Sequence, residues 1–259
     1  MEIRTISPEV DDRRYLEFDF GRRGAPSAIL STLAAGNMKH DPSAVNLARG
    51  RFFSGLGLEP SRILSLQLRH TRGVIFQGKG EAMTDLHQKA DALGGADGLV
   101  VAEPDSIPAL TVADCMPIWL FDPKNEVFGL LHSGWRGTGI LREAVLGMVS
   151  RFGSAPGDIS AILGPSIGAC CYTVPEERAM TFAAEFGETS IRAASAETGK
   201  DRASFSIDLR AANIRLAENL GLGTLLDVKI CTSCSPNMGS FRRQGAQDFT
   251  RMLALCGYF

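Results

Sequence analysis

The sequence predicts a mixed fold of β-strands and α-helices in one domain. Two apolar runs, residues 109–121 and 127–131, flank the turn-forming segment 122–126, which is the pattern of an antiparallel hairpin. Apolar residues then recur at helical spacing over residues 140–152, and Gly153 ends that helix. The chain has 259 residues, 44% of them hydrophobic, and no linker-like segment, so we expect a single domain over 1–259.

The remaining elements follow from the same signals. The first helix is expected at 42–53, because Asp41 can cap it and Pro42 suits the first helical position. In the last helix Asp208 is the cap, and glycines end both of the C-terminal helices. The polar, small-residue segment 189–203 indicates a loop. The other expected strands are 15–20, 63–68, 74–76, 99–101, 159–163 and 228–231, and the other expected helices are 82–92, 176–186 and 209–220.

Composition narrows the classes of partner. The net charge is −2 and the pI about 6.1, so the chain has no strong basic field and nucleic acid is not an expected partner. No apolar run reaches the length of a membrane span, and the first residues lack the apolar core of a signal peptide. We therefore expect a cytoplasmic protein with six reduced cysteines, no membrane partner and a small-molecule substrate.

The hairpin carries a candidate metal-ligand pair. When it is folded about its turn, Cys115 and His132 lie opposite each other or one step apart. A zinc ion can span that gap with a thiolate and an imidazole. His70, at the end of the apolar run 63–68, is the candidate for the third ligand.

Basic and small residues near this hairpin indicate anion binding. Gly134 and Arg136 lead into the helix that begins near Thr138, and a helix N-terminus favours anions. Arg22 and Arg242 lie in loops and are further candidates for contact with an anionic substrate. Another candidate is Ser166, because the glycines around it let a ligand approach the backbone.

The other polar residues have simpler expected roles. Cys170 and Cys171 are adjacent and would point in opposite directions on a strand, which favours packing over chelation. The CxxC at 231–234 has no second CxxC, so a structural zinc is not expected there. For the remaining three residues we expect a turn at Asp97, a surface or capping position for His40, and a structural or supporting position for Asp114.

Several motifs in this order resemble the laccase-domain family, whose members are called polyphenol oxidase, peptidoglycan editing factor or purine nucleoside phosphorylase. The resemblance implies an α+β fold, a mixed β-sandwich core with helices packed on the outside in α/β/β/α layers. It also implies a zinc ion held by His70, Cys115 and His132. The motifs are ADGLVV at 96–101, TVADCMPIWLFD at 111–122, LHSGWRGTGI at 131–140, ILGPSIGACCY at 162–172 and CTSC with SFRR at 231–243.

The family implies phosphorolysis of adenosine and inosine (and methylthioadenosine), with adenosine deamination alongside, so nucleoside and phosphate are the expected substrates. An alternative is hydrolysis of an amide in a cell-wall precursor, by zinc-activated water or by Cys115 as nucleophile with His132 as base. Copper oxidase chemistry is disfavoured because four histidines cannot supply several coppers. A zinc-stabilised binding module without activity is the non-enzymatic alternative, and the oligomeric state stays open.

Overall fold

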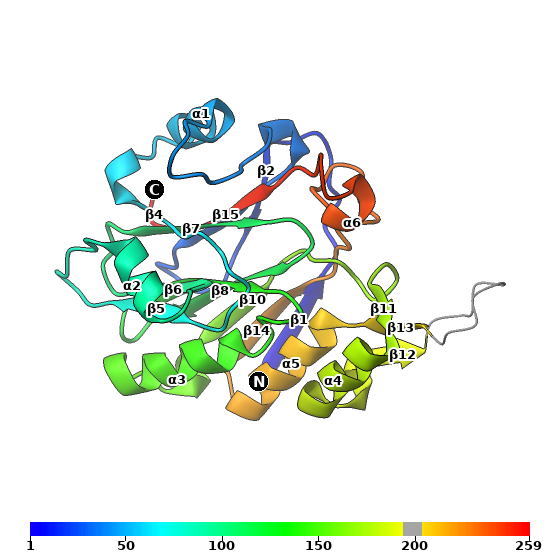
Figure 1. The fold of residues 1–259 in the computed structure, drawn as a ribbon. Helices are drawn as coiled ribbons and strands as arrows, with labels where there is room; N and C mark the ends of the chain where they lie inside the picture. Colours follow the sequence, from blue (N-terminus) through cyan, green and yellow to red (C-terminus); the bar gives the residue numbers. More distant parts are fainter. Residues whose placement is uncertain (194–203) are drawn as a thin grey trace.

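The computed structural model describes residues 1–193 and 204–259, and its centre is a pair of β-sheets packed face to face (Figure 1). The larger sheet has seven strands in the order β1-β14-β10-β8-β9-β6-β5, of mixed direction. Its strands are β1 (Glu2–Ile6), β5 (Val74–Gln77), β6 (Gly98–Val101), β8 (Met116–Asp122), β9 (Val127–Ser133), β10 (Ser160–Leu163) and β14 (Thr224–Val228).

The second sheet of the sandwich has five strands in the order β2-β3-β15-β7-β4. A small three-stranded sheet, β11-β13-β12, lies beside the sandwich (Figure 1). The five-stranded sheet contains β2 (Tyr15–Phe18), β3 (Ser27–Ser31), β4 (Ile63–Ser65), β7 (Ile107–Val112) and β15 (Met252–Gly257). The small sheet contains β11 (Thr173–Pro175), β12 (Ile191–Ala193) and β13 (Ser204–Ile207).

Helices cover both outer faces of the sandwich. In Figure 1, α3 (Ile140–Phe152) and α5 (Leu209–Leu220) lie beneath the seven-stranded sheet, and α4 (Glu176–Phe186) lies beside α5. Above the five-stranded sheet is α1 (Leu47–Gly55). Two short helices, α2 (Leu86–Ala92) and α6 (Phe241–Gln244), complete the set in the described residues. The layers are therefore α/β/β/α, as the family resemblance implies.

Alternating side chains explain why the layers form. In β8, Ile118 and Leu120 pack in the cluster that contains α3 and α5, whereas Trp119 and Phe121 point between the two sheets. Successive strand residues face opposite sides of a sheet, so an apolar run such as β8 is buried on both faces. The indole N–H of Trp119 donates to the backbone oxygen of Leu255 across the sandwich, at 2.7 Å, which satisfies the one polar atom of this large buried side chain.

The expected single strand over 109–121 is wrong, and the difference matters for the site. The chain leaves the five-stranded sheet at the end of β7 and enters the seven-stranded sheet at the start of β8. At the crossing Asp114 adopts a left-handed backbone conformation with φ of +83°. The apolar run is continuous because both halves are buried, so sequence periodicity alone does not reveal the change of sheet.

Several further boundaries differ from expectation. Helix α2 begins at Leu86 rather than at 82, and β2 and β4 end at Phe18 and Ser65 rather than at 20 and 68. The first helix begins at Leu47 rather than Pro42, because the Asp41 side chain accepts the Ser43 N–H in a local turn while Asn46 caps the helix. The strand expected at 228–231 is β14, which ends at Val228. Helices α3, α4 and α5 have the predicted bounds. The expected loop at 189–203 contains β12, and residues 194–203 lie outside the described residues.

Among residues 1–193 and 204–259, none of the helices has the length and apolar character needed to cross a bilayer.

Candidate metal centre

Three potential metal ligands meet at one end of the sandwich. The ligand atoms of His70, Cys115 and His132 all lie within 4.8 Å of one another. The two imidazole rings are 5.0 Å apart between centroids and are inclined by 74°. His132 is buried and Cys115 is half-buried, whereas His70 is exposed, so the group is open on the His70 side. The structure thus brings together the three residues that the sequence analysis selected.

The pairing of Cys115 with His132 differs in register from the expected one. His132 is directly opposite Pro117 in the β8–β9 ladder, and Cys115 lies two residues before Pro117, in the bend that leads into β8. Because side chains alternate with a period of two, this shift keeps Cys115 on the same face as His132. The hairpin therefore supplies both ligands to one side of the sheet.

Two of the three ligands lie on segments that cross between the sheets. His70 lies between β4 of the five-stranded sheet and β5 of the seven-stranded sheet, and Cys115 lies between β7 and β8. His70 has φ of +58°, a left-handed conformation that non-glycine residues seldom adopt. Such conformations persist only where surrounding contacts hold them.

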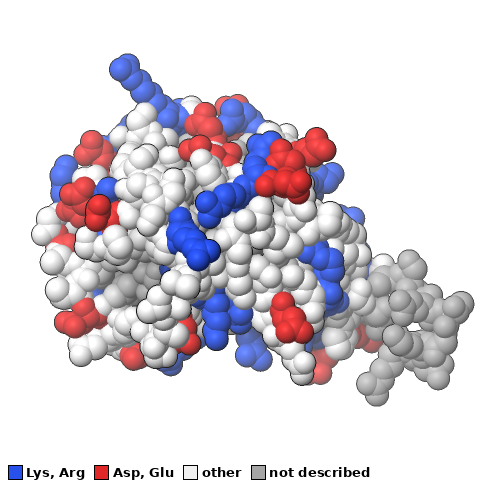
Figure 2. Space-filling view, turned by 90° about the horizontal axis from the view of Figure 1, so that it is seen from above, with Lys and Arg blue, Asp and Glu red and all other residues white. Residues whose placement is uncertain are grey.

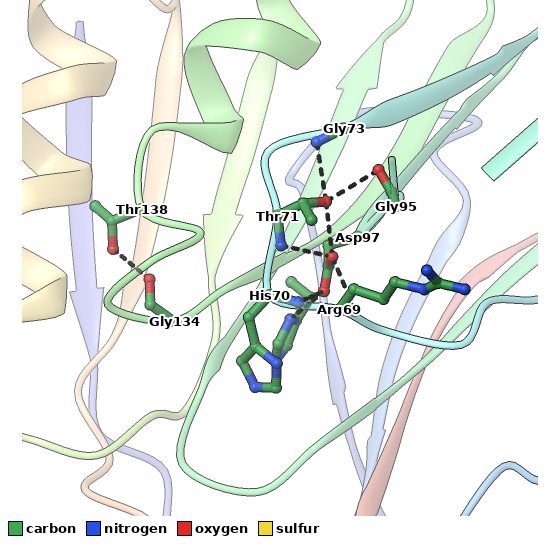
Figure 3. Close-up of polar contacts among 9 residues, drawn as sticks. Arg69, His70, Thr71, Gly73, Gly95, Asp97, Gly134 and Thr138 are labelled. Atoms are coloured by element: carbon green, nitrogen blue, oxygen red, sulfur yellow. Dashed lines mark hydrogen bonds and ion pairs between the residues drawn. The ribbon is translucent and has the colours of Figure 1, made fainter. Parts of the chain in front are cut away.

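Asp97 supplies those contacts (Figure 3). Its buried carboxylate accepts the backbone N–H groups of Arg69, His70 and Thr71 at 3.2, 3.0 and 2.8 Å. The Thr71 hydroxyl donates to the same carboxylate, at 3.0 Å. The Oδ1 atom of Asp97 lies 2.9 Å from Nδ1 of His132. One carboxylate therefore shapes the His70 loop and orients His132 with its Nε2 free for a metal ion.

The turn expected at Asp97 does not describe its role, which is to hold the His70 loop and His132. Burial raises the pKa of Asp97, but the hydrogen bonds from His132 and Thr71 outweigh burial and hold the pKa below the usual range of a carboxyl. The carboxylate is therefore ionised at neutral pH. Its position directly before β6, in the motif ADGLVV, is the only signal the sequence offers.

The pKa values of Cys115 and His132 shift toward an ion pair. Burial raises the pKa of the Cys115 thiol, but the adjacent His132 ring more than offsets this and lowers the pKa to about 6. Burial lowers the pKa of His132, whereas the Cys115 thiolate and Asp97 raise it to about 10. Without metal, the proton thus resides on the imidazole and the thiol is ionised. A cation at this position would take the place of that proton.

These donors match the preferences of zinc. Thiolate and imidazole ligands are typical of zinc sites, and three protein ligands leave a fourth position for water or substrate. The carboxylate–histidine contact at Asp97 is the supporting arrangement that metal-bound histidines commonly have. Glycine is required at position 134, because a Cβ there would lie only 2.6 Å from the Cys115 sulfur. The group can therefore hold a metal ion, and Gly134 keeps the space beside the thiolate clear.

The site opens into a cavity of about 610 Å3, a size typical of small-molecule pockets. Figure 2 looks onto the face of the molecule that carries α1 and α6, where Lys and Arg side chains lie near the centre. The cavity wall combines aromatic rings with cationic groups. It includes Trp135, Tyr172, Phe241 and Phe249 among the aromatic residues and Lys39, Arg178, Arg242 and Arg251 among the cationic ones.

Arg242 and Asp114 connect the cavity wall to the metal centre. The Asp114 carboxylate accepts the Arg242 backbone N–H at 2.7 Å and the Thr232 hydroxyl at 2.6 Å. The guanidinium group of Arg242 donates to the backbone oxygens of Cys171 and Thr173, at 3.0 and 3.1 Å, and lies over the Tyr172 ring. Asp114 thus has the structural role expected for it, and Arg242 lines the cavity.

The other selected residues lie elsewhere. Arg22 is exposed, outside the cavity wall, with its Nε 3.5 Å from the Ser160 hydroxyl. Arg136 is exposed, with its guanidinium carbon 5.2 Å from the centroid of the Trp135 ring, and its side chain does not line the cavity. Ser166 lines a separate, smaller hollow. Gly134 and Trp135 do line the cavity, but the next side chain, Arg136, lies over the Trp135 ring, and local sequence does not specify which way it turns.

The start of α3 is also not open to an anion. Thr138 is buried and donates to the Gly134 oxygen (Figure 3). A Cβ added at Gly139 would contact the Arg72 guanidinium, which pairs with Glu185 of α4. The cation–anion pair Arg72–Glu185 therefore occupies the space in front of the helix.

Most aromatic and cationic residues of the cavity wall have no signal in the sequence, and Arg178 and His40 are two examples. Arg178 lies 4.7 Å from the Trp135 ring centroid and reaches the cavity from α4. His40, expected at the surface, also lines the cavity. Burial and the charge of Arg49 lower its pKa to about 4, so it is neutral at physiological pH. Neither residue has a local motif that would reveal its position.

The chain has relatives among proteins named purine nucleoside phosphorylase or adenosine deaminase. Purine nucleoside phosphorylase YlmD of Bacillus subtilis is 33% identical over 188 residues, which cover 71% of this chain and 65% of that protein. A protein named adenosine deaminase RL5, from an unknown prokaryotic organism, is 33% identical over 188 residues, covering 71% of this chain and 70% of that protein. The chain spans less than two thirds of the Bacillus protein and about half of the mouse and human relatives named purine nucleoside phosphorylase LACC1.

The fold has solved counterparts. The crystal structure of YlmD from Geobacillus stearothermophilus superimposes with a TM-score of 0.74 at 26% identity, covering 96% of this chain and 98% of that one. A family model described as multi-copper polyphenol oxidoreductase laccase matches residues 20–258, nearly the whole chain. With its sandwich fold and its His–Cys–His group, the chain belongs to the multi-copper polyphenol oxidoreductase laccase family.

Proposed function

We propose that this protein is a zinc-dependent purine nucleoside phosphorylase that acts on adenosine and inosine. The observation that carries the proposal is the cavity of about 610 Å3, which joins the His70–Cys115–His132 group to a wall of aromatic and cationic side chains. The names of the family relatives point to the same reaction class. Methylthioadenosine is a further substrate that we expect.

The cavity wall suits the parts of a nucleoside and a phosphate. The rings of Tyr172 and Phe249 line the cavity, and each has an arginine, Arg242 or Arg251, over one face. A purine can stack on the other face, which is a binding mode that every base allows. Arg178 offers a guanidinium group, which matches phosphate oxygens with paired N–H donors, whereas both Nη atoms of Arg242 already donate to backbone oxygens and its positive charge alone faces the cavity. In the described part of the chain, Arg178 has no ion pair with a carboxylate, so its charge is available to an anion.

In phosphorolysis a phosphate oxygen bonds to the sugar C1′, and the bond from C1′ to the purine nitrogen breaks. Its electron pair goes to the purine, which takes up the proton that hydrogen phosphate loses as it becomes the sugar phosphate. A zinc ion held by His70, Cys115 and His132 would supply Lewis-acid chemistry at this end of the cavity. Arg178 holds the attacking phosphate, and Asp97 fixes the ring of His132. Burial raises the pKa of Tyr172 to about 12, so its hydroxyl stays protonated and can donate a hydrogen bond to the substrate.

Adenosine deamination is the second activity we propose for the same cavity, supported by the relative named adenosine deaminase RL5. Zinc deaminases add water to the purine ring and release ammonia. The reaction needs no phosphate. Phosphate dependence therefore separates the two activities.

The test is turnover of adenosine and inosine by metal-analysed protein, with and without phosphate. We expect base release that requires phosphate, inosine formation from adenosine that does not, and loss of both in Cys115→Ala. Cys256→Ala is the matched control, because it removes a buried thiol that is not part of the cavity wall. A zinc-loaded protein inert toward both nucleosides would refute the proposal and favour hydrolysis of a cell-wall precursor.

A further inference from the structure

A second group of potential metal ligands lies outside the cavity. Cys170, Cys171, Cys231 and Cys234 come from two loops about 60 residues apart in sequence. The loops follow β10 and β14, which are parallel neighbours in the seven-stranded sheet, so both leave the same edge of that sheet. The backbone of Ser166 pairs with that of Cys231, which fixes one loop against the other. The fold therefore brings the four thiols together.

The spacing of the sulfurs is that of ligands around a single ion. All four sulfurs lie within 4.8 Å of one another. The sulfur of Cys234 is 3.7 Å from that of Cys170 and 3.4 Å from that of Cys171. In a tetrahedral site with zinc–sulfur bonds of about 2.3 Å, the sulfurs are about 3.8 Å apart. A disulfide would bring two of them to about 2.05 Å, which is much closer.

We propose that these four cysteines bind a second zinc ion in a closed tetrathiolate site. Four thiols lose their protons to solvent as four zinc–sulfur bonds form, which leaves the site with a net charge of −2. Four protein ligands fill the tetrahedron, so this ion is structural and has no open position for a substrate. An iron–sulfur cluster is disfavoured, because its cysteines bind different irons and some of their sulfurs must lie farther apart.

The surrounding backbone is arranged for thiolates. The Gly168 N–H donates to the Cys231 sulfur at 3.2 Å, a contact that stabilises negative charge on sulfur. Glycine at position 168 also leaves room for the sulfurs, since a Cβ there would lie 3.1 Å from the sulfur of Cys170. The Arg243 guanidinium donates to the backbone oxygens of Ser233 and Ser235, at 3.0 and 2.7 Å. It holds the CxxC loop in place and brings a positive charge to it.

This site would brace the wall of the substrate cavity. Tyr172, which lines the cavity, directly follows Cys171 in the chain. The Arg242 guanidinium, also in the wall, is bound to the Cys171 backbone oxygen. On the other loop, Thr232 lies between the two CxxC cysteines and donates to Asp114, next to the ligand Cys115. Zinc at the four cysteines would therefore fix both loops without touching substrate.

The experiment counts zinc per chain in a background that lacks the first site. The Cys115→Ala variant is compared with Cys115→Ala/Cys234→Ser, both purified under reducing conditions and analysed for bound metal. Cys234 is exposed, so its change leaves the core intact, and circular dichroism checks the fold. Ser233→Ala in the same background is the matched control, because it changes the same loop and keeps all four thiols. The zinc content is also compared between the unmodified chain and its Cys234→Ser single variant.

We expect close to one zinc ion in Cys115→Ala and in the Ser233→Ala control, and close to none after Cys234→Ser. The unmodified chain should hold two ions and its Cys234→Ser variant one. Cobalt substitution should give the intense visible absorption of a tetrahedral thiolate site, lost with Cys234→Ser. Equal zinc contents with and without Cys234→Ser would overturn the proposal, as would four freely titratable thiols, or a disulfide, in zinc-saturated protein. None of these readouts depends on nucleoside turnover.

Discussion

Replacing Asp97 with asparagine tests the view that one carboxylate builds the metal centre. The carboxylate accepts hydrogen bonds on both oxygens. Oδ1 accepts from the His70 backbone N–H and from His132. Oδ2 accepts from the backbone N–H groups of Arg69 and Thr71 and from the Thr71 hydroxyl. Asparagine has one acceptor and one donor group at these positions. Whichever way the amide is oriented, at least two N–H donors of the His70 loop or of His132 lose their acceptor.

The size of the effect follows from that count. A buried donor left without a partner costs about 1–3 kcal/mol, so two such donors lower the free energy of unfolding by about 2–6 kcal/mol. That is a large part of the total of about 5–15 kcal/mol for a typical domain. Loss of the contact to His132 also weakens metal binding by about 10–100-fold, which is the usual effect of removing such a supporting group.

Two measurements check these values. Urea denaturation of the metal-free protein gives the free energy of unfolding, and competition with a chromophoric chelator gives the zinc affinity. Asp91→Asn is the matched control, because Asp91 pairs with Arg69 at 2.8 Å on the exposed surface of the same loop and should contribute at most about 1 kcal/mol. If Asp97→Asn changes stability and zinc affinity no more than Asp91→Asn, the role assigned to Asp97 is wrong.

Three other substitutions probe the cavity. Gly134→Ala should weaken zinc binding at least about tenfold, or about 1.4 kcal/mol, because the new Cβ displaces the Cys115 thiolate. An unchanged zinc affinity in the chelator competition would contradict this prediction. The pKa of His40 is about 4 in the folded protein and about 6.5 in the unfolded chain, so the unfolded chain binds more protons between these pH values. The free energy of unfolding therefore falls as the pH drops from about 6.5 to about 4. In urea titrations, His40→Gln should show a shallower fall over this range than the unmodified chain. Arg178→Gln should raise the KM for phosphate about tenfold and leave the KM for nucleoside nearly unchanged, whereas Arg142→Gln, on the exposed surface of α3, should alter neither in steady-state assays.

The sequence located the parts of the site that are local. Cys115 and His132 lie on one hairpin, so turn residues and apolar runs were enough to pair them, although the register is shifted by two residues. His70 was selected only from its position at the end of an apolar run and from the family resemblance. The helices were predictable where caps and glycine stops are clear, as in α5, where the Asp208 side chain accepts the Ala211 N–H.

The parts that were missed depend on contacts between distant segments. Asp97 looks like a turn residue until β6 pairs with β9 and places it beside His132. Cys170 and Cys171 seemed unsuited to chelation because a strand was assumed, whereas they lie in a loop after β10. Their contact with Cys234 depends on the parallel pairing of β10 with β14, and single-sequence patterns carry no information about that pairing.

The two sheet crossings make the metal centre sensitive to distant packing. His70 and Cys115 are each attached to both sheets, whereas His132 belongs to the seven-stranded sheet alone. If one sheet slides or tilts on the other, the distances from His132 to the other two ligands must change. Replacing side chains between the two sheets, such as Trp119, with larger or smaller ones would therefore alter the metal affinity without any substitution near the ligands. A metal ion bound by the three residues would in turn link the two sheets and oppose their separation at that end of the sandwich.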